Sequence, residues 1–211
     1  MPIDKEIARE KMILAGERLI AQQGLEGLSL RKVNLAANQK NTSAALYHFG
    51  DKQGLLLAIF DYRLEHVDQR RHALLDKDES TVSALMRAWI LPDIEEVTEA
   101  EGGSFHARFL GVVTNHPDFN FADLWRRPHA SSFMRVNNGL KKLLPELPST
   151  ILSMRFGMAM MQSICTMAEQ ERQQTISTQL LTCHLVDIMT AIFTAPLSND
   201  TRRELQRNNN R

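Results

Sequence analysis

The sequence predicts an all-α protein of about nine helices. Apolar residues recur at intervals of three and four along most of the chain, which is the period of one helix face. No stretch alternates apolar and polar residues while also being rich in β-branched types, as a strand would be. Glycine, proline and asparagine punctuate the apolar segments, so the segments are expected to be separate helices joined by turns.

The first predicted helix precedes Gly24. Ala8, Met12, Ala15 and Leu19 form one apolar stripe. Gly24 is a plausible end because glycine tolerates the left-handed conformation found after a helix C-terminus. This segment is therefore expected to be an amphipathic helix with one buried face.

A second, short helix is predicted to begin after Ser29, which can accept a hydrogen bond as an N-cap. Leu30, Val33 and Ala37 of this helix face one way. Residues 38–41 then read as a turn, because asparagine caps helices and tolerates positive φ.

The third and fourth helices are predicted over residues 42–49 and about 53–75. Asn41 is a suitable N-cap for the third helix, in which Ala45 and Phe49 share the inward face. Gly50 and Asp51 break the pattern before the fourth helix begins.

Four regions follow from this reading. Residues 1–52 are expected to form a helix-turn-helix domain, and residues 53–75 a connecting helix. The acidic and polar residues 76–80 mark a boundary, and the second helical domain is expected to begin there and to span residues 76–195. Its long helices are predicted near residues 149–173 and 175–193. Residues 196–211 have little apolar surface to bury and are expected to be disordered.

Two short helices joined by a tight turn and braced by a longer helix make a helix-turn-helix, whose second helix enters the major groove of DNA. With Ala45 and Phe49 inward, the polar and aromatic residues of the third helix project outward, and basic residues flank them where they can meet phosphates. The candidate DNA-contacting residues are Arg31, Lys40, Thr42, Ser43, Leu46, Tyr47, His48 and Lys52. Short helices with polar turns also occur in any all-α protein, so spacing alone leaves open that Tyr47 and His48 are ordinary surface residues.

The first 75 or so residues resemble the DNA-binding domain of the TetR/AcrR-type bacterial transcriptional regulators. The resemblance runs from "ILAGERLIAQQGLEGLSLRKV" through "AANQKNTSAALYHFGDKQGLLLAIF", which carries a Tyr-His-Phe sequence, a two-residue spacer and a lysine. It implies that Tyr47, His48 and Lys52 contact DNA and that Thr42 and Ser43 open the recognition helix. The chain departs from the family in lacking the glycine of an Ala-Gly-Val-Ser turn, in a turn one residue longer, and in Leu46, where an aromatic residue is common.

The same resemblance implies a homodimer paired through the last two long helices. Apolar stripes on those helices agree with it, although the partner of these stripes could equally be the rest of the same chain. The candidate dimer residues are Met154, Met158, Met161, Cys165, Leu181, Leu185, Ile188 and Ile192.

In this family the middle helices enclose a small-molecule pocket, and methionine suits adaptable apolar pockets. The candidate ligand-binding residues are Trp89, Phe105, Phe109, Phe133, Met158 and Met161. Such residues are also typical of plain core. The candidate polar anchors are His106, Arg108, His129 and Arg155, each of which could instead be a surface or ion-paired residue.

Several other functions have no support in the sequence. The formal net charge is zero, which argues against a purely electrostatic nucleic-acid binder. No catalytic motif, phosphate-cradling loop or cofactor motif is found, and no metal site is indicated. Cys165 and Cys183 indicate no disulfide framework, and no apolar run approaches the ~20 residues of a membrane span.

We therefore expect a cytoplasmic, dimeric, sequence-specific DNA-binding regulator, a repressor whose binding to DNA is relieved by a small molecule. Its expected partners are a palindromic double-stranded operator, a second copy of the chain and a largely apolar effector, with no membrane. The alternatives are a helical protein-interaction module and a small helical enzyme or ligand-binding protein, neither of which binds DNA.

Overall fold

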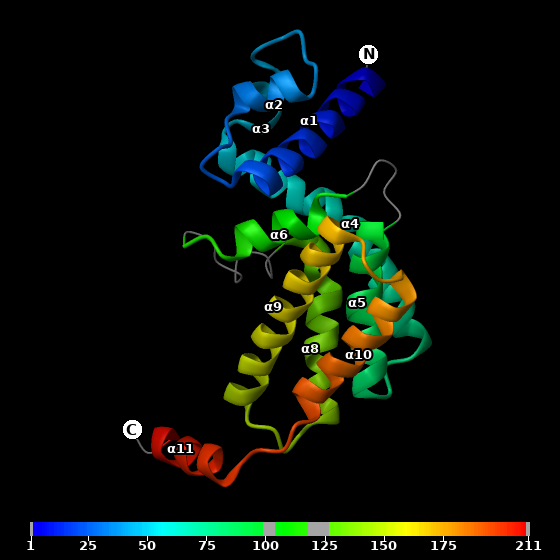
Figure 1. Cartoon of the computed structure of the whole chain (residues 1–211), viewed down its shortest axis with the longest axis vertical. Helices are drawn as coiled ribbons and strands as arrows, with labels where there is room; N and C mark the ends of the chain where they lie inside the picture. Colours follow the sequence, from blue (N-terminus) through cyan, green and yellow to red (C-terminus); the bar gives the residue numbers. More distant parts are fainter. Residues whose placement is uncertain (1, 99–103, 118–126, 210–211) are drawn as a thin grey trace.

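The computed structural model describes residues 2–98, 104–117 and 127–209. Every regular element in those ranges is a helix, so the all-α prediction is confirmed. The molecule is elongated, with the N-terminal helices at one end and the C-terminal helix at the other (Figure 1).

The N-terminal end consists of α1 (Pro2–Gln23), α2 (Leu30–Ala36) and α3 (Ala44–Phe49), which we call the head. Gly24 ends α1 with a positive φ of 76°, as predicted for a glycine at this position. Ser29 begins α2, since its hydroxyl oxygen accepts a hydrogen bond from the amide of Lys32 at 3.2 Å.

The start of α3 differs from the prediction. The side chain of Asn41 accepts a hydrogen bond from the amide of Ser43 at 2.9 Å, which forms an Asx turn instead of an N-cap. The helix therefore begins at Ala44, and Thr42 and Ser43 lie in the turn before it. Asn38, with a φ of 54°, supplies the left-handed residue in the same connection.

Helix α4 (Lys52–Lys77) is a single helix of 26 residues that leaves the head and continues through the rest of the molecule. Asp51 caps it by accepting a hydrogen bond from the amide of Gly54 at 2.7 Å. A Cβ atom on Gly54 would collide with the backbone carbonyl of Phe49. Glycine at this position lets the end of α3 lie directly against the start of α4.

The remaining helices form what we call the body, and they are bounded as follows: α5 (Val82–Thr98), α6 (His106–Thr114), the 3-10 turn η1 (Pro128–Ala130), α8 (Ser131–Leu143), α9 (Ser149–Gln173) and α10 (Thr178–Thr194). Helix α9 has the predicted span. Helix α10 begins three residues later than predicted, because Gln174 is left-handed and the hydroxyl of Ser177 caps the new helix by accepting from the amide of Leu180.

The C-terminal tail is helical, which corrects the expectation of disorder. Helix α11 (Asn199–Asn209) lies apart from the body at the end of the molecule (Figure 1). Ion pairs between Arg203 and Asp200 and between Arg207 and Glu204 join neighbouring turns of the helix. Such pairs stabilise a helix locally without any apolar face to bury.

Two hydrophobic cores lie along the molecule. The core of the body is built from α4, α5, α8, α9 and α10. The core of the head contains Phe60 of α4 and also Phe109 and Val113 of α6, which are fully buried there. Helix α6 thus contributes to both cores, since its Ala107 is buried in the core of the body, although it follows the head by more than fifty residues in the sequence.

No single helix in the described residues is long and apolar enough to cross a membrane, and only the bent pair of α10 and residues 199–208 passes by length and composition.

Candidate nucleic-acid interface and adjoining cavity

Helix α3 presents an exposed face with an unusual composition. Leu46 and Tyr47 are 57% and 73% exposed, whereas Ala45 and Phe49 are buried in the head core. This is the inward and outward division that the sequence spacing predicts. Thr42 and Ser43 of the preceding turn are also exposed, so four of the candidate residues are accessible on one short segment.

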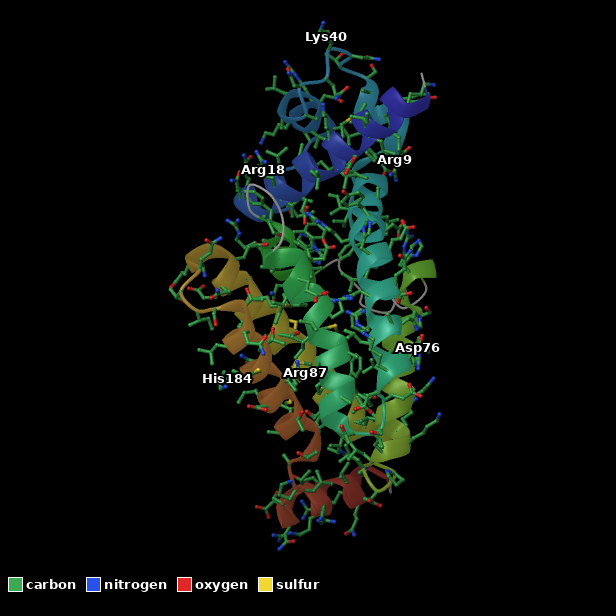
Figure 2. The ribbon with its side chains drawn as sticks, turned by 90° about the vertical axis from the view of Figure 1, so that its right-hand side faces the viewer. Arg9, Arg18, Lys40, Asp76, Arg87 and His184 are labelled. Carbon is green, nitrogen blue, oxygen red and sulfur yellow. The ribbon has the colours of Figure 1, made fainter. Side chains whose placement is uncertain are left out.

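The basic candidates surround this segment. Arg31, Lys40 and Lys52 are exposed, and Figure 2 shows Lys40 at the extreme end of the molecule. His48 is half-buried, with its ring centroid 5.2 Å from that of Tyr47 and 6.0 Å from that of Phe49. Of the basic candidates, His48 is therefore the one that also packs against its neighbours.

Asn34 fixes the position of α3, and the sequence analysis did not identify it. Its buried side chain donates from Nδ2 to the carbonyl oxygen of Thr42 at 2.6 Å and accepts at Oδ1 from the amide of Ala45 at 2.9 Å. A single amide on α2 thus holds the last turn residues and the first turn of α3. The sequence signal for this role is weak: Asn34 is a polar residue that directly follows Val33, a member of the predicted buried stripe of this helix.

Two further residues add to the exposed surface of the head. Leu35 on α2 is 82% exposed, which is uncommon for a leucine in a short helix, and its position lies off the buried stripe of α2. The ammonium group of Lys5 lies 5.7 Å from the centroid of the Tyr47 ring. The N-terminal part of α1 therefore brings a positive charge to the face on which Tyr47 lies.

A small cavity lies in the body next to the head. Its volume is about 60 Å³. Helices α4, α5, α6, α8 and α9 and the turn η1 line it, with these residues: Phe60, Arg63, Leu64, Val67, Trp89, Asp93, His106, Leu110, Thr114, Ala130, Phe133, Met160, Ser163, Ile164 and Met167. Trp89 and Phe133 are the two candidate ligand-binding residues that line it, and their rings meet edge to face at 5.6 Å.

The other four candidate ligand residues do not line this cavity. Phe109 is fully buried in the head core, where its ring lies 5.1 Å from that of Phe60. Phe105 precedes α6 and packs against the guanidinium of Arg108 at 4.4 Å. Met158 is exposed on α9, and Met161 lines a shallow groove on the outer surface. Periodicity marked these residues as apolar but could not show which way they face.

The polar end of the cavity consists of Arg63, Asp93 and His106, of which only His106 was a candidate anchor. Asp93 accepts a hydrogen bond from the fully buried Arg71 at 2.9 Å. Burial raises the pKa of Asp93 and lowers the pKa of Arg71, because removal from water disfavours each charge more than the pairing restores it. Arg71 also donates to the carbonyl oxygen of Trp89 at 3.2 Å.

The same polar end is joined to the head through Glu17 of α1. Arg63 donates to both carboxylate oxygens of Glu17, at 3.2 and 2.7 Å, and to Glu96 at 2.9 Å. The Nδ1 atom of His106 lies 3.5 Å from Glu17 and has no hydrogen-bond partner within the described residues. Burial alone would raise the pKa of Glu17, but the interactions with His106 and Arg63 outweigh it and lower that pKa.

The remaining candidate polar anchors do not line the cavity. Arg108 forms an ion pair with Glu171 at 2.9 Å, and Arg155 donates to the carbonyl oxygens of Phe193 and Ala195. His129 lies half-buried in η1. Among the residues that the structure describes, no three His, Cys, Asp or Glu side chains are grouped so that they could hold a metal ion.

The candidate dimer residues divide into two groups. Met154, Met158, Cys165 and Ile188 are exposed on α9 and α10, and Met161 and Ile192 are half-buried. Leu181 and Leu185, in contrast, are buried in the core of their own chain, which corrects their assignment to a surface. Leu180, one position before Leu181, is 57% exposed and was not among the candidates.

Comparison with known proteins identifies the family. The family described as "Tetracyclin repressor-like, C-terminal domain" matches residues 87–195, about half of the chain. The chain belongs to the TetR family.

Two solved structures of regulators share the fold of this TetR-family chain. A TetR-family transcriptional regulator from Rhodococcus sp. is 16% identical with a TM-score of 0.54, and the match covers 90% of this chain and 100% of that one. The fatty acid degradation regulator FadR from Bacillus halodurans is 14% identical with a TM-score of 0.56, covering 89% and 99% of the two chains. No curated protein sequence matches this chain.

Proposed function

We propose that this TetR-family protein is a dimeric, sequence-specific DNA-binding transcriptional regulator of the cytoplasm. We further propose that it is a repressor whose operator binding is relieved by a small, largely apolar molecule. The observation that carries the proposal is the exposed face of α3, where Leu46 and Tyr47 project from the far end of the molecule while Asn34 holds the helix in place.

The residues of this face match the two tasks of a DNA-binding helix. Tyr47, Thr42 and Ser43 supply hydroxyl groups for base edges, and Leu46 offers apolar contact to a thymine methyl group. Arg31, Lys40 and Lys52 carry positive charges around them and would bind phosphates, which fixes the position on the duplex without reading its sequence.

A second copy of the chain is the proposed partner of the exposed apolar face on α9 and α10. Met158 is 59% exposed and lies on this face with Met154, Leu180 and Ile188. Several large apolar side chains exposed on two neighbouring helices are typical of an interface. Two heads joined in this way would bind half-sites one helical turn apart, about 34 Å, in a two-fold symmetric operator.

The proposed effector acts through the cavity next to the head. Because the cavity is small, a ligand can enter only if the surrounding helices move apart. Arg63 lines the cavity and also binds Glu17 of α1, so movement of α4 is transmitted to the head through this ion pair. A ligand that binds the widened form better shifts the population toward a head spacing that no longer fits the operator.

The test is to select random duplex DNA with the purified protein and to sequence what it retains. We expect a two-fold symmetric motif with half-sites about one turn apart. A Tyr47→Ala variant should lose or change the motif, and a Lys141→Ala variant, altered at an exposed site on α8, should retain it. If the unaltered protein enriched no sequence at low salt, the proposal would be wrong.

A further inference from the structure

We propose that the cavity takes an amphiphilic cation, a molecule in which a protonated amine is attached to an apolar body. The inference deepens the proposed function, on which it rests, by naming the chemical class of the effector. It stands on three observations: the balance of buried charges around the cavity, the aromatic walls, and the carboxylate of Asp93, which lines the cavity and accepts from Arg71 through Oδ2.

The buried charges around the cavity are predominantly negative. Four carboxylates are buried or partly buried near the cavity, those of Glu17 on α1, Asp68 on α4, and Asp93 and Glu96 on α5, and of these Asp93 lines it. Two guanidinium groups face them, because Arg63 pairs with Glu17 and Glu96, and Arg71 pairs with Asp93. Asp68 instead accepts from the amide and hydroxyl groups of neighbouring serines and lies 3.6 Å from His72.

Other charged groups on these helices do not alter the balance. They form ion pairs of their own: Arg70 with Glu95, Arg108 with Glu171, Arg127 with Asp61, and Arg135 with Asp76 and Glu79. A carboxylate ligand would add a fifth negative charge to a site with two guanidinium groups, which is costly in an interior of low dielectric constant. An ammonium ligand would instead reduce the excess of negative charge.

Asp93 is the carboxylate placed to receive the ammonium group. It lines the cavity directly, and its side chain is 13% exposed while that of its partner Arg71 is completely buried. The bond to Arg71 uses Oδ2, and within the described residues no hydrogen bond is made to Oδ1. Hydrogen bonds between an ionised donor and an ionised acceptor are the strong ones, so this oxygen favours a cationic head group.

His106 lies at the same end of the cavity as Asp93 but does not compete with it for the head group. The residue is 4% exposed and lines the cavity. Its Nδ1 atom lies 3.5 Å from a carboxylate oxygen of Glu17, which can only accept, so this nitrogen carries the proton and cannot accept from a ligand. The amine would therefore donate to Asp93.

The aromatic walls suit the same head group. Phe60, Trp89 and Phe133 line the cavity, and aromatic faces attract cations. The guanidinium of Arg71 already lies 3.9 Å from the centroid of the Phe133 ring. The apolar body of the ligand would lie toward Met160, Ile164 and Met167 of α9, where methionine side chains can adapt to its shape.

The test compares three probes that share an eight-carbon chain: octylamine, octanol and octanoate. Each is titrated into the full-length protein at neutral pH by calorimetry. We expect octylamine to bind about tenfold or more tightly than octanol, equivalent to about 1.4 kcal/mol, and octanoate to bind most weakly. Tightest binding by octanoate, equal binding of the three probes, or no binding of octylamine would each overturn the proposal.

Two variants test whether Asp93 causes the preference for octylamine over octanol. Asp93→Asn should bind octylamine and octanol equally, whereas the control Asp200→Asn, on α11, should keep the preference of the unaltered protein. If Asp93→Asn fails to fold, the three-probe comparison on the unaltered protein still tests the ligand class.

The ligand class and the regulatory function can fail separately. If octylamine is preferred but the protein enriches no DNA sequence, the ligand class stands and the regulatory function fails. If DNA is enriched and octylamine is not preferred, only the ligand class fails.

Discussion

Replacement of Asn34 by alanine tests how α3 is held in the head. The substitution removes a donor to the carbonyl oxygen of Thr42 at 2.6 Å and an acceptor from the amide of Ala45 at 2.9 Å. The amide of Ala45 belongs to the first turn of α3, where no carbonyl of the same helix can accept from it. Both backbone groups would lose their partner in a site where Asn34 and Ala45 are almost completely buried.

A buried polar group left without a partner costs about 1–3 kcal/mol. The amide of Ala45 is buried, whereas Thr42 is exposed and water can reach its carbonyl, so the expected loss in the free energy of unfolding is about 1–3 kcal/mol. The affinity for the operator should fall as well, because α3 would no longer be fixed against α2. This loss should be similar for different operator sequences, since Asn34 itself is buried and contacts no base.

The assay is urea unfolding followed by circular dichroism, combined with operator titration of the folded protein. The control is Asn138→Ala, because Asn138 is exposed on α8 and its replacement should change the free energy of unfolding by no more than about 0.5 kcal/mol. An Asn34→Ala protein as stable as this control, with unchanged operator affinity, would show that the two hydrogen bonds do not position α3.

Four further predictions concern the head, its link to the cavity and the dimer. Lys52→Ala should weaken binding to all DNA sequences and reduce the slope of affinity against salt concentration by about one, since it removes one phosphate contact. Glu17→Gln should lower the free energy of unfolding near neutral pH. The pKa of Glu17 is below its ordinary value of 4.5, so the ionised carboxylate stabilises the fold above pH 4.5. The difference in stability between the variant and the unaltered protein should therefore shrink as the pH falls below 4.5. Gly54→Ala should destabilise the protein by about 2 kcal/mol or more in urea unfolding, because its Cβ would collide with a backbone carbonyl. Met158→Glu should convert the dimer to a monomer in analytical ultracentrifugation, since it places a charge in the proposed interface.

Each of these predictions has a matched control or a refuting outcome. An unchanged salt slope would remove Lys52 from the phosphate contacts, and a pH-independent effect of Glu17→Gln would contradict the lowered pKa. Gly111→Ala should be tolerated, because its Cβ would meet only ordinary contacts at 3.9 Å. Ile7→Glu, at an exposed isoleucine on α1, should leave the dimer intact, and a dimer that survives Met158→Glu would place the interface elsewhere.

The elements that local chemistry determines could be predicted from the sequence. Helix α9 spans residues 149–173 as predicted, because Pro148 precedes it and its apolar period is unbroken. The inward faces of Ala45 and Phe49 also follow directly from helical periodicity. The predicted start of α3 was wrong because the side chain of Asn41 accepts a hydrogen bond from the backbone amide two residues later. Such turns compete with helix capping.

Features that depend on distant contacts could not be predicted. Leu180 and Leu181 are adjacent leucines, and periodicity does not show which one faces the core of its own chain. Asp93 reads as one more charge after a proline, and its place at the cavity depends on Arg71, 22 residues earlier. The bond between Glu17 and Arg63 joins residues 46 positions apart, so no sequence window contains both.

The burial of Phe109 and Val113 of α6 in the head core limits how this protein could exchange parts with its relatives. A recombination event that transferred only the first 77 residues to a new body would leave the underside of the head without these side chains. Removal of one buried phenylalanine alone costs about 3–5 kcal/mol, a large part of the stability of an ordinary domain. The packed head therefore consists of two separate stretches of the chain, and a stable hybrid must carry α6 together with the head.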